Sequence, residues 1–255
     1  MKKAELKRFL DEKASHYEQP SFLTKDPIQI PHRFQKKEDI EIIGFLTAVI
    51  AWGNRLSILK SADRLLKLMD EAPYDFIQNH SEKDRDRFEG FVHRTFQADD
   101  ARYFVKALQE IYRHHNGLEY FLSKHYKITG DLQTTLTQFK ADFFSFDPPK
   151  RSLKHLPDPQ KGSAAKRINM YLRWMVRPAT RNVDFGLWKE IPPAALSCPL
   201  DVHSGRVARS LGLLKRKQND AKAVAELDKA LRSFDPVDPV KYDFALFGLG
   251  VDEKF

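Results

Sequence analysis

The sequence predicts an all-α protein. Apolar residues recur every three or four positions along most of the chain, which is the spacing of one helix face. No stretch alternates Val, Ile or Thr between turn residues in the two-residue period of a strand, so strands are not expected. Prolines cluster between the periodic segments and divide the chain into about ten to thirteen helices.

The periodic segments follow one another in a clear order. A charged amphipathic segment predicts an N-terminal helix, and three prolines between residues 20 and 31 predict an extended loop after it. Five further helices are predicted by their apolar faces, which are Ile40, Ile43, Leu46 and Ile50; Leu59, Ala62, Leu65, Leu66 and Met69; Phe104, Val105, Leu108, Ile111 and Tyr112; Leu132, Leu136, Phe139 and Phe143; and Val224, Leu227, Leu231 and Phe234. Turns are expected at residues 147–149, 156–162, 192–193 and 235–239, the last before a final helix.

The length of 255 residues suits one large domain or two lobes that share a core. We expect a single domain over residues 1–255, with lobes at residues 37–147 and 148–255 and with residues 1–20 joining the second lobe. Phe is common, with 19 residues, so aromatic side chains are expected to fill the core.

The composition excludes several classes of protein. Cys198 is the only cysteine, which rules out an internal disulfide, a four-cysteine zinc site and a cysteine-ligated iron–sulfur cluster. No apolar run approaches the roughly 18 residues of a membrane span, and the N-terminus lacks the apolar stretch of a signal peptide. We therefore expect a cytoplasmic, monomeric protein with no metal and no membrane partner.

Positive charge is concentrated in one quarter of the chain. The net charge is +8; residues 150–217 carry 15 Lys and Arg against 4 Asp and Glu, whereas the rest carries 28 basic and 31 acidic residues. A localised basic face is typical of a nucleic-acid-binding surface. The alternative is a solvated basic surface that binds nothing.

The first segment that could carry catalytic chemistry, residues 161–175, is a short basic turn followed by a helix. Ser163 is placed to cap that helix, and the N–H groups at its start could hold a phosphate. Lys166 is expected one turn into the helix, beside its buried face. Partial burial would favour a neutral, nucleophilic amine; the alternative is an ordinary surface lysine.

The second segment, residues 199–212, begins with an apolar, proline-rich turn. Asp201 stands at the expected N-cap of a helix, where a carboxylate either caps the helix or serves in a site. His203 fits a hydrogen-bonding partner within the fold better than a metal ligand, because no second ligand stands at metal-binding spacing. Arg206 and Arg209 share a face, which fits phosphate contact or solvation.

These two segments together resemble the helix-hairpin-helix DNA glycosylases, a superfamily that includes endonuclease III and the archaeal 8-oxoguanine glycosylases. In that superfamily a Leu-Pro-Gly-x-Gly hairpin precedes a helix with a catalytic lysine, and an Asp-Thr-His segment opens a later helix. Here residues 156–157 and Gly162 match the hairpin, and Lys166 takes the place of the lysine. Residues 201–213 match the second motif closely, with Val202 in place of Thr.

Two more stretches are similar to landmarks of that superfamily. Residues 48–54 resemble a helix end and loop that present a DNA-intercalating amide, which implies that role for Asn54. Residues 243–250 resemble the helix before the iron–sulfur loop, but the cluster cysteines are absent, so no cluster is expected. The hairpin has Pro-Asp-Pro in place of Gly-rich sequence, which leaves Lys161 as a rival nucleophile. The whole chain is also similar to a bacterial family known only as a domain of unknown function.

The resemblance implies a two-lobed, all-α enzyme of DNA base-excision repair, nucleoid-associated and without a cofactor. Its partner would be double-stranded DNA with a damaged or abasic nucleotide, possible substrates including oxidised purines such as 8-oxoguanine. Lys166 would form a Schiff base with the sugar, which adds AP lyase activity, and Asp201 would stabilise positive charge on the sugar. The residues expected to contact DNA are Asn54, Arg55, Lys161, Gly162, Ser163, Arg167, Arg173, His203, Arg206 and Arg209. Those expected at the base pocket are Trp52, Trp174 and Trp188.

Two other functions fit the same sequence. A non-catalytic DNA-binding protein on this fold would bind DNA in a salt-dependent way without forming an adduct. An all-α protein-interaction module would have no DNA affinity at about 100 mM salt.

Overall fold

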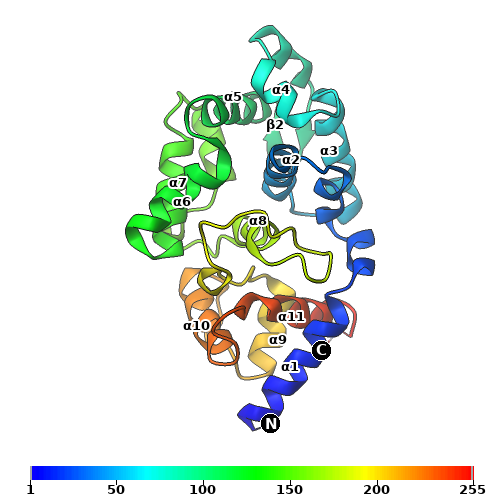
Figure 1. Ribbon diagram of the computed structural model, residues 1–255, viewed down its shortest axis with the longest axis vertical. Coiled ribbons are helices and arrows are strands. Elements are labelled where there is room, and N and C mark those ends of the chain that lie inside the picture. The colour runs from blue at the N-terminus through cyan, green and yellow to red at the C-terminus, as the bar shows by residue number, and fades with distance from the viewer. Residues whose placement is uncertain (1, 254) are drawn as a thin grey trace. The chain divides into compact units, whose positions relative to one another are not determined.

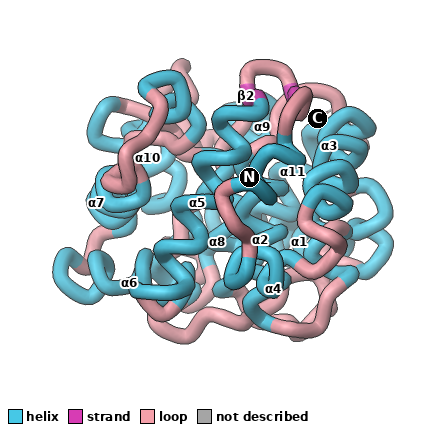
Figure 2. Tube along the Cα trace, turned by 90° about the horizontal axis from the view of Figure 1, so that it is seen from above, coloured by secondary structure: helices cyan, strands magenta, loops and turns pink. Residues whose placement is uncertain are grey.

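The computed structural model describes residues 2–253 and 255, and almost all regular structure in them is helical (Figures 1 and 2). These residues form eleven α-helices: α1 (Lys3–Tyr17), α2 (Lys37–Val49), α3 (Arg55–Leu68), α4 (Pro73–Asn79), α5 (Ala98–His114), α6 (Gly117–Thr129), α7 (Leu132–Phe143), α8 (Lys166–Val176), α9 (Val202–Ser210), α10 (Ala221–Arg232) and α11 (Tyr242–Val251). The all-α prediction is confirmed, and each of the five periodic apolar segments overlaps a helix, with Ile50, Met69 and Phe234 just past the helix ends.

Two local predictions were wrong. The expected extended loop at residues 20–31 folds into three short 3₁₀ helices, Pro20–Lys25, Pro27–Gln29 and Pro31–Arg33. Proline begins each of them because its fixed φ suits the first residue of a helical turn. A two-residue hairpin also exists, in which β1 (Val92–His93) pairs antiparallel with β2 (Phe96–Gln97). Its strands are too short to show a two-residue period in the sequence.

The chain divides into two compact units. Unit 1 consists of residues 1–24, 131–133 and 158–255, and unit 2 of residues 25–130 and 134–157. Unit 1 is therefore discontinuous in sequence, and it contains both segments that carry the candidate chemistry.

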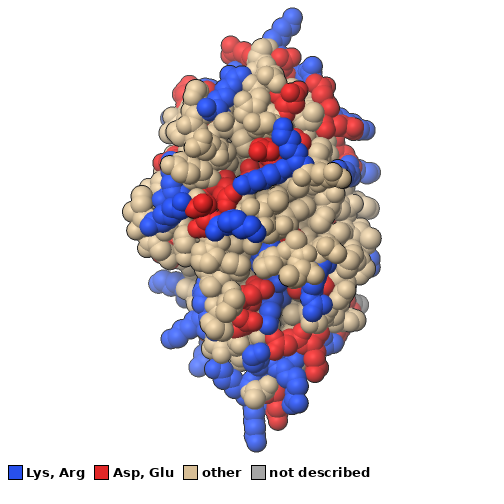
Figure 3. All heavy atoms as spheres, viewed as in Figure 1, with Lys and Arg blue, Asp and Glu red and all other residues tan. Residues whose placement is uncertain are grey.

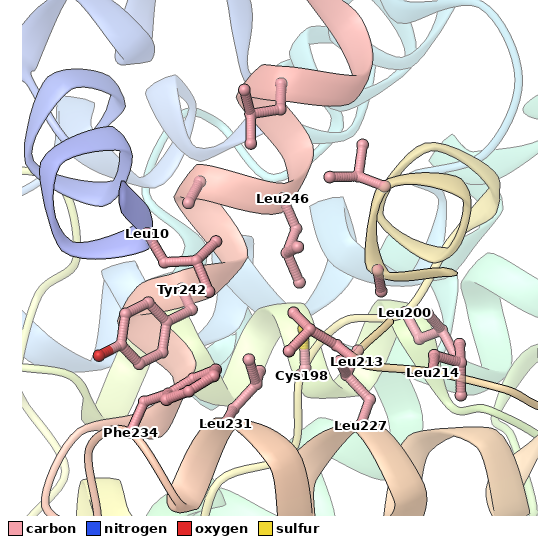
Figure 4. Close-up of a cluster of buried hydrophobic side chains, with 14 of the residues drawn as sticks. Leu10, Cys198, Leu200, Leu213, Leu214, Leu227, Leu231, Phe234, Tyr242 and Leu246 are labelled. Carbon is pink, nitrogen blue, oxygen red and sulfur yellow. The ribbon is translucent and has the colours of Figure 1, made fainter. Parts of the chain in front are cut away.

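The core of unit 1 forms where α1, α9, α10 and α11 meet (Figure 4). Leu10 of α1, Leu231 of α10 and Leu246 of α11 point into it, and Cys198 lies among them. Within this unit α11 packs against both α1 and α9. The packing of α9 against α11 fixes the position of α9 in unit 1, and with it the position of its N-cap, Asp201.

Two glycines let the neighbours of α11 approach closely. A Cβ on Gly248 would lie 2.3 Å from Cδ2 of Tyr17, and one on Gly250 would lie 3.0 Å from the carbonyl oxygen of His203. The first contact sets how close α1 comes to α11, and the second sets how close α9 comes. Neither helix could sit at its present distance if these positions carried side chains.

Unit 2 has an aromatic core, as the abundance of Phe predicts. Phe45 of α2 lies with its ring centroid 5.5 Å from that of Phe143, and Phe104 of α5 lies 4.9 Å from Phe143. Phe139 adds an edge-on contact to Phe45 at 6.1 Å. Such tilted and edge-to-face pairs are the favoured geometry of packed aromatic rings.

Among the residues described, no helix combines the length and the apolar character that crossing a bilayer would need.

We predict that Gly248→Ala destabilises the protein by about 1–3 kcal/mol, because the added methyl overlaps the Tyr17 ring. Urea unfolding followed by circular dichroism measures this loss. In a Tyr17→Ala background the ring is gone, so the same glycine substitution should cost little. An equal cost in both backgrounds would show that Tyr17 does not limit the approach of α1.

Candidate active site

Lys166 is the first residue of α8, not one turn inside it as expected. The helix starts there because Ala165, its N-cap, has a left-handed backbone with φ of +50°. Ser163 does not cap the helix; its Oγ accepts a hydrogen bond from the N–H of Ala165 at 3.2 Å. Lys166 therefore projects from a sharp corner, and its side chain is 32% exposed.

The turn before α8 uses its own N–H groups. The N–H groups of Lys161 and Ser163 both donate to the carbonyl of Asp158 at 3.1 Å, and that of Gly162 donates to Pro159 at 2.9 Å. Gly162 takes a φ of +91°, which favours glycine. The N–H groups of Gly162 and Ser163 are therefore occupied within the turn, and a phosphate at the N–H groups that begin α8 stays a prediction.

Asp201 is the N-cap of α9, as the sequence predicts, and its two carboxylate oxygens have different partners. Oδ1 accepts hydrogen bonds from the backbone N–H groups of His203 and Ser204, at 2.8 and 2.9 Å. In return the N–H of Asp201 donates to Oγ of Ser204 at 2.9 Å, which completes a capping box. Oδ2 lies 3.8 Å from Nζ of Lys166.

The structure thus brings together the two residues that the sequence singled out, across 35 positions of chain. The Asp201 side chain is 19% exposed, so both side chains of the pair are partly open to solvent. Lys161, the rival, is 85% exposed and lies 3.8 Å from Asp158 instead. The geometry therefore favours Lys166 over Lys161 as the partner of Asp201.

A second set of contacts fixes the backbone of Asp201. Nδ2 of Asn219 donates to the Asp201 carbonyl at 2.8 Å, and Arg209 donates to Oδ1 of Asn219 at 2.6 Å. Gly205 makes room for this contact, because a Cβ there would lie 2.8 Å from Oδ1 of Asn219. Arg209 also donates to the carbonyl of Arg216 at 2.8 Å. Its guanidinium is thus committed to the fold, which corrects its expected role at phosphate.

Behind the pair lies a chain of buried charges that sequence reasoning missed. Nη1 of Arg173 donates to Oδ2 of Asp243 at 2.6 Å, and its Nε donates to Asp184 at 3.3 Å. Arg177 contacts the other oxygen of Asp184 at 2.5 Å. It also donates to Asp238 at 2.9 Å and to Glu18 of unit 1 at 2.8 Å. These carboxylates raise the pKa of Arg177, although burial opposes them.

Three expected ligand contacts are corrected by burial. Arg173 is buried in these ion pairs and does not reach the surface as a DNA-binding residue would. Trp174 and Trp188 are fully buried as well, and Trp188 packs edge-on against Tyr171 with ring centroids 5.4 Å apart. They are core residues of unit 1 and are not open to an extruded base.

The other residues of unit 1 that were expected to contact DNA differ in how exposed they are. Arg206 is exposed, although its Nη2 donates to the carbonyl of Gly250 at 2.7 Å. His203 is exposed and lies edge-on to Phe247, with ring centroids 6.5 Å apart. Arg167 is half-buried, and burial lowers its pKa to about 10. Lys161, His203 and Arg206 are the members of this set whose side chains are exposed.

The basic segment is less positive at the surface than its sequence suggests. Arg173 and Arg177 are buried among carboxylates, and Arg216 forms an ion pair with Asp220. In Figure 3, Lys and Arg side chains gather over α1 and α10 with Asp and Glu among them. The charge count therefore overstated the basic field of this unit.

The three candidates in unit 2 lie around the start of α3. The Asn54 side chain is exposed and caps α3, accepting a hydrogen bond from the N–H of Ser57 at 3.3 Å. Arg55 begins the helix. Trp52 is half-buried, edge-on to His93 with ring centroids 5.1 Å apart and stacked on His155. Of the three tryptophans, only Trp52 keeps part of its surface exposed.

Asp228 makes the stability of unit 1 depend on pH. It is buried, accepts a hydrogen bond from the N–H of Cys198 at 2.9 Å, and burial raises its pKa to about 6. An acid whose pKa is raised by folding loses stabilising free energy as the pH rises from the unfolded to the folded pKa. The loss in the free energy of unfolding caused by Asp228 therefore grows between about pH 4 and pH 6 and is complete at pH 8.

We expect Asp228→Asn to gain stability relative to the wild type as the pH rises from 4 to 8, by up to roughly 2–3 kcal/mol. Guanidinium unfolding at both pH values measures the difference in free energy of unfolding between the variant and the wild type. Asp220→Asn is the control: the Arg216 ion pair lowers the pKa of Asp220 to about 2, so its effect should stay constant over this range. A pH-independent effect of Asp228→Asn would refute the raised pKa.

Comparisons with known proteins place the chain without assigning it an activity. Neither the curated proteins nor the solved structures provide a match to this chain. One family model matches residues 26–252, which confirms the expected relation to an uncharacterised family. The match spans nearly the whole chain, both units included, so the protein belongs to the family described as "protein of unknown function (DUF2400)".

Proposed function

We propose that this protein is a helix-hairpin-helix DNA glycosylase of base-excision repair, with AP lyase activity through Lys166. The observation that carries the proposal is the 3.8 Å separation between Nζ of Lys166 and Oδ2 of Asp201, both reachable from solvent in one unit. Base excision with lyase chemistry needs an amine nucleophile and an anion side by side.

The proposed reaction starts at the anomeric carbon of a nucleotide extruded from the duplex. The bond from C1′ to the base breaks, and the base leaves with the electron pair. Oδ2 of Asp201 stabilises the positive charge that grows on the sugar. The neutral amine of Lys166 forms the new bond to C1′ and passes a proton to the departing base anion. The C1′–O4′ bond then breaks, O4′ takes a proton from water, and an iminium forms. Loss of a proton from C2′ then expels the 3′ phosphate.

The cap of α9 suits Asp201 to this task. Oδ1 is held by two backbone N–H groups, so the carboxylate cannot rotate freely, and Oδ2 stays directed toward Lys166. Helix N-terminal dipoles also favour the anionic form of a carboxylate placed there. A charge that is already oriented needs no reorganisation during the reaction.

Contacts with DNA are proposed for the exposed candidates. In unit 1 these are Lys161, His203 and Arg206, which would approach phosphates. In unit 2 the exposed Asn54, with the half-buried Arg55 beside it, would approach the gap left by the base. Trp52 remains a candidate for stacking on a base.

We expect Lys166→Gln to abolish the adduct that borohydride traps on duplex DNA carrying an abasic site, 8-oxoguanine, thymine glycol or uracil. Gln keeps most of the side-chain length and cannot form an imine. Lys161→Gln is the matched control and should retain the adduct. Loss of the adduct in Lys161→Gln, with retention in Lys166→Gln, would move the nucleophile to the rival lysine.

Asp201→Asn separates capping from charge, because Asn caps a helix about as well as Asp. We expect a melting temperature close to that of the wild type and adduct formation slower by roughly 10²- to 10³-fold. Asp201→Ala, which loses both functions, should also cost about 1 kcal/mol of stability. Rapid adduct formation by Asp201→Asn would show that the negative charge is not used.

The second candidate function is DNA binding without catalysis. The occupied N–H groups of the turn before α8 favour it, because the backbone there offers less to a phosphate than the resemblance implies. A gel shift with abasic duplex at two salt concentrations, together with trapping, distinguishes the cases. Salt-dependent binding without an adduct would establish this second function, and no binding at about 100 mM salt would exclude both.

A further inference from the structure

A two-residue turn joins β1 to β2 in unit 2, and Arg94 is the first residue of this turn. Arg94 has a left-handed backbone, with φ of +56°. This conformation is uncommon for residues other than glycine and asparagine, because Cβ comes too close to the following carbonyl oxygen. Two-residue hairpin turns usually place Gly, Asn or Asp at such positions. An arginine here is unfavourable for the turn itself, which calls for a reason outside the turn.

Side-chain contacts hold the hairpin in place from both of its strands. On the side of β1, His93 contacts Oγ of Ser61 in α3 at 2.9 Å through Nδ1, and the carbonyl oxygen of Trp52 at 3.2 Å through Nε2. On the side of the turn and β2, Nη2 of Arg151 donates to the carbonyl oxygen of Thr95 at 3.2 Å. The turn is therefore tied to α3, to the loop after α2 and to the segment after α7.

The two carboxylates that follow β2 have partners other than Arg94. Asp100 is fully buried in the first turn of α5, where its Oδ2 lies 3.3 Å from Nη2 of Arg151 and 3.2 Å from Nε2 of His155. Asp99 is exposed and lies 3.6 Å from Nη1 of Arg102. The buried charge of Asp100 thus fixes Arg151, which in turn fixes the hairpin.

The side chain of Arg94 lies against Gly53, in the loop between α2 and α3. A Cβ on Gly53 would overlap Nη1 of Arg94 and would lie 3.1 Å from its Cδ, so the guanidinium needs a glycine at this place. Gly53 also has a φ of +98°, which favours glycine. Arg94 is exposed, and within residues 2–253 and 255 its guanidinium has no hydrogen-bond or ion-pair partner. Its N–H donors are therefore held at a fixed place and are open to a ligand.

The residues that follow Gly53 suit contact with nucleic acid. Asn54 is exposed, Arg55 is half-buried, and the Leu56 side chain is 68% exposed. A guanidinium thus lies within a few residues of an exposed amide and an exposed apolar side chain. Proteins that bind a DNA groove often combine basic, amide and apolar side chains, which favours DNA over an acidic peptide as the partner.

We propose that Arg94 binds a backbone phosphate of DNA and that the β1–β2 hairpin is the rigid element that presents it. The proposal rests on the proposed function in one respect, namely that DNA is the partner. A guanidinium offers its N–H donors in a planar fork that matches two oxygens of a phosphate. A phosphate held at Arg94 would bring Asn54 and Leu56 against the adjacent groove.

Arg94→Asn removes the guanidinium and keeps a residue that tolerates the left-handed backbone. We expect its melting temperature to be no lower than that of the wild type. Its Kd for duplex DNA should rise about tenfold at about 100 mM salt. The slope of log K against log salt should fall in magnitude by about one, which corresponds to one lost phosphate contact. Arg94→Gly, which has no steric limit at this φ, is a second variant for the same comparison.

Fluorescence anisotropy on the whole chain measures binding between about 50 and 200 mM salt. The duplex carries a tetrahydrofuran analogue of an abasic site, which has no aldehyde and cannot form an imine with Lys166, so the measurement reports binding alone. Arg87→Asn is the matched control. Arg87 is another exposed arginine of unit 2, but its Nη1 is already paired with Asp70 at 2.6 Å. The Kd and the salt slope of this control should stay at their wild-type values.

The outcomes separate this inference from the proposed function. Weaker and less salt-dependent binding by Arg94→Asn, with no change in Arg87→Asn, supports the phosphate contact whether or not borohydride traps an adduct at Lys166. A trapped adduct in the wild type, together with unchanged binding by Arg94→Asn, refutes the phosphate contact alone.

Three further results would overturn the inference. Equal losses of affinity in Arg94→Asn and Arg87→Asn would show a general effect of net charge. Polyglutamate that displaces the duplex from the wild type, but not from Arg94→Asn, at an equal concentration of charge would identify an acidic peptide as the partner. No binding of DNA by the wild type at about 100 mM salt would overturn both this inference and the proposed function.

Discussion

Unit 1 depends on the burial of two arginines, Arg173 in the last turn of α8 and Arg177 directly after it. Arg173 and Arg177 share Asp184, and each reaches a second carboxylate from a distant part of the chain. Charges removed from water are tolerated because each finds opposite charges and hydrogen bonds at its destination. The same contacts tie α8 to α1, to α11 and to the segment before α11. The position of Lys166 at the start of α8 follows from this anchoring.

Asp201 shows how one carboxylate can cap a helix and still face a cation. One oxygen ends α9 by satisfying donors that the helix leaves unpaired, and the other is left for Lys166. The structural role therefore determines where the chemical group points. This arrangement also explains why position alone could not decide between a capping role and a site role for this residue: the carboxylate caps α9 and also faces Lys166.

Much of the fold could be predicted from the sequence, because helix periodicity reports which face of each segment is buried. The N-cap at Asp201 could be predicted too, since capping is a local property of a few residues. Arg173 and Trp174 could not be placed, because α8 is covered on almost every side from Ile168 onward. Trp188 lies in the segment after α8, where no helix period reports which side is buried. Arg173 is buried because it contacts Asp243, which lies 70 positions later in the sequence, and local periodicity does not report such a contact. Asp243 carried no signal of its own, because its role comes from the charges around it.

The division of the chain has a consequence for biosynthesis. Residues 25–130 leave the ribosome before most of unit 1 exists, while α1 is already made and its partner α11 is made only after α10. Until then the apolar face of α1 has nothing native to cover it. In the nascent chain the apolar face of α1 stays without its native cover until α11 is made. A chaperone or transient contacts would shield it during that time. Removal of α11 should therefore expose α1 to proteolysis, although the sequence of α1 is unchanged.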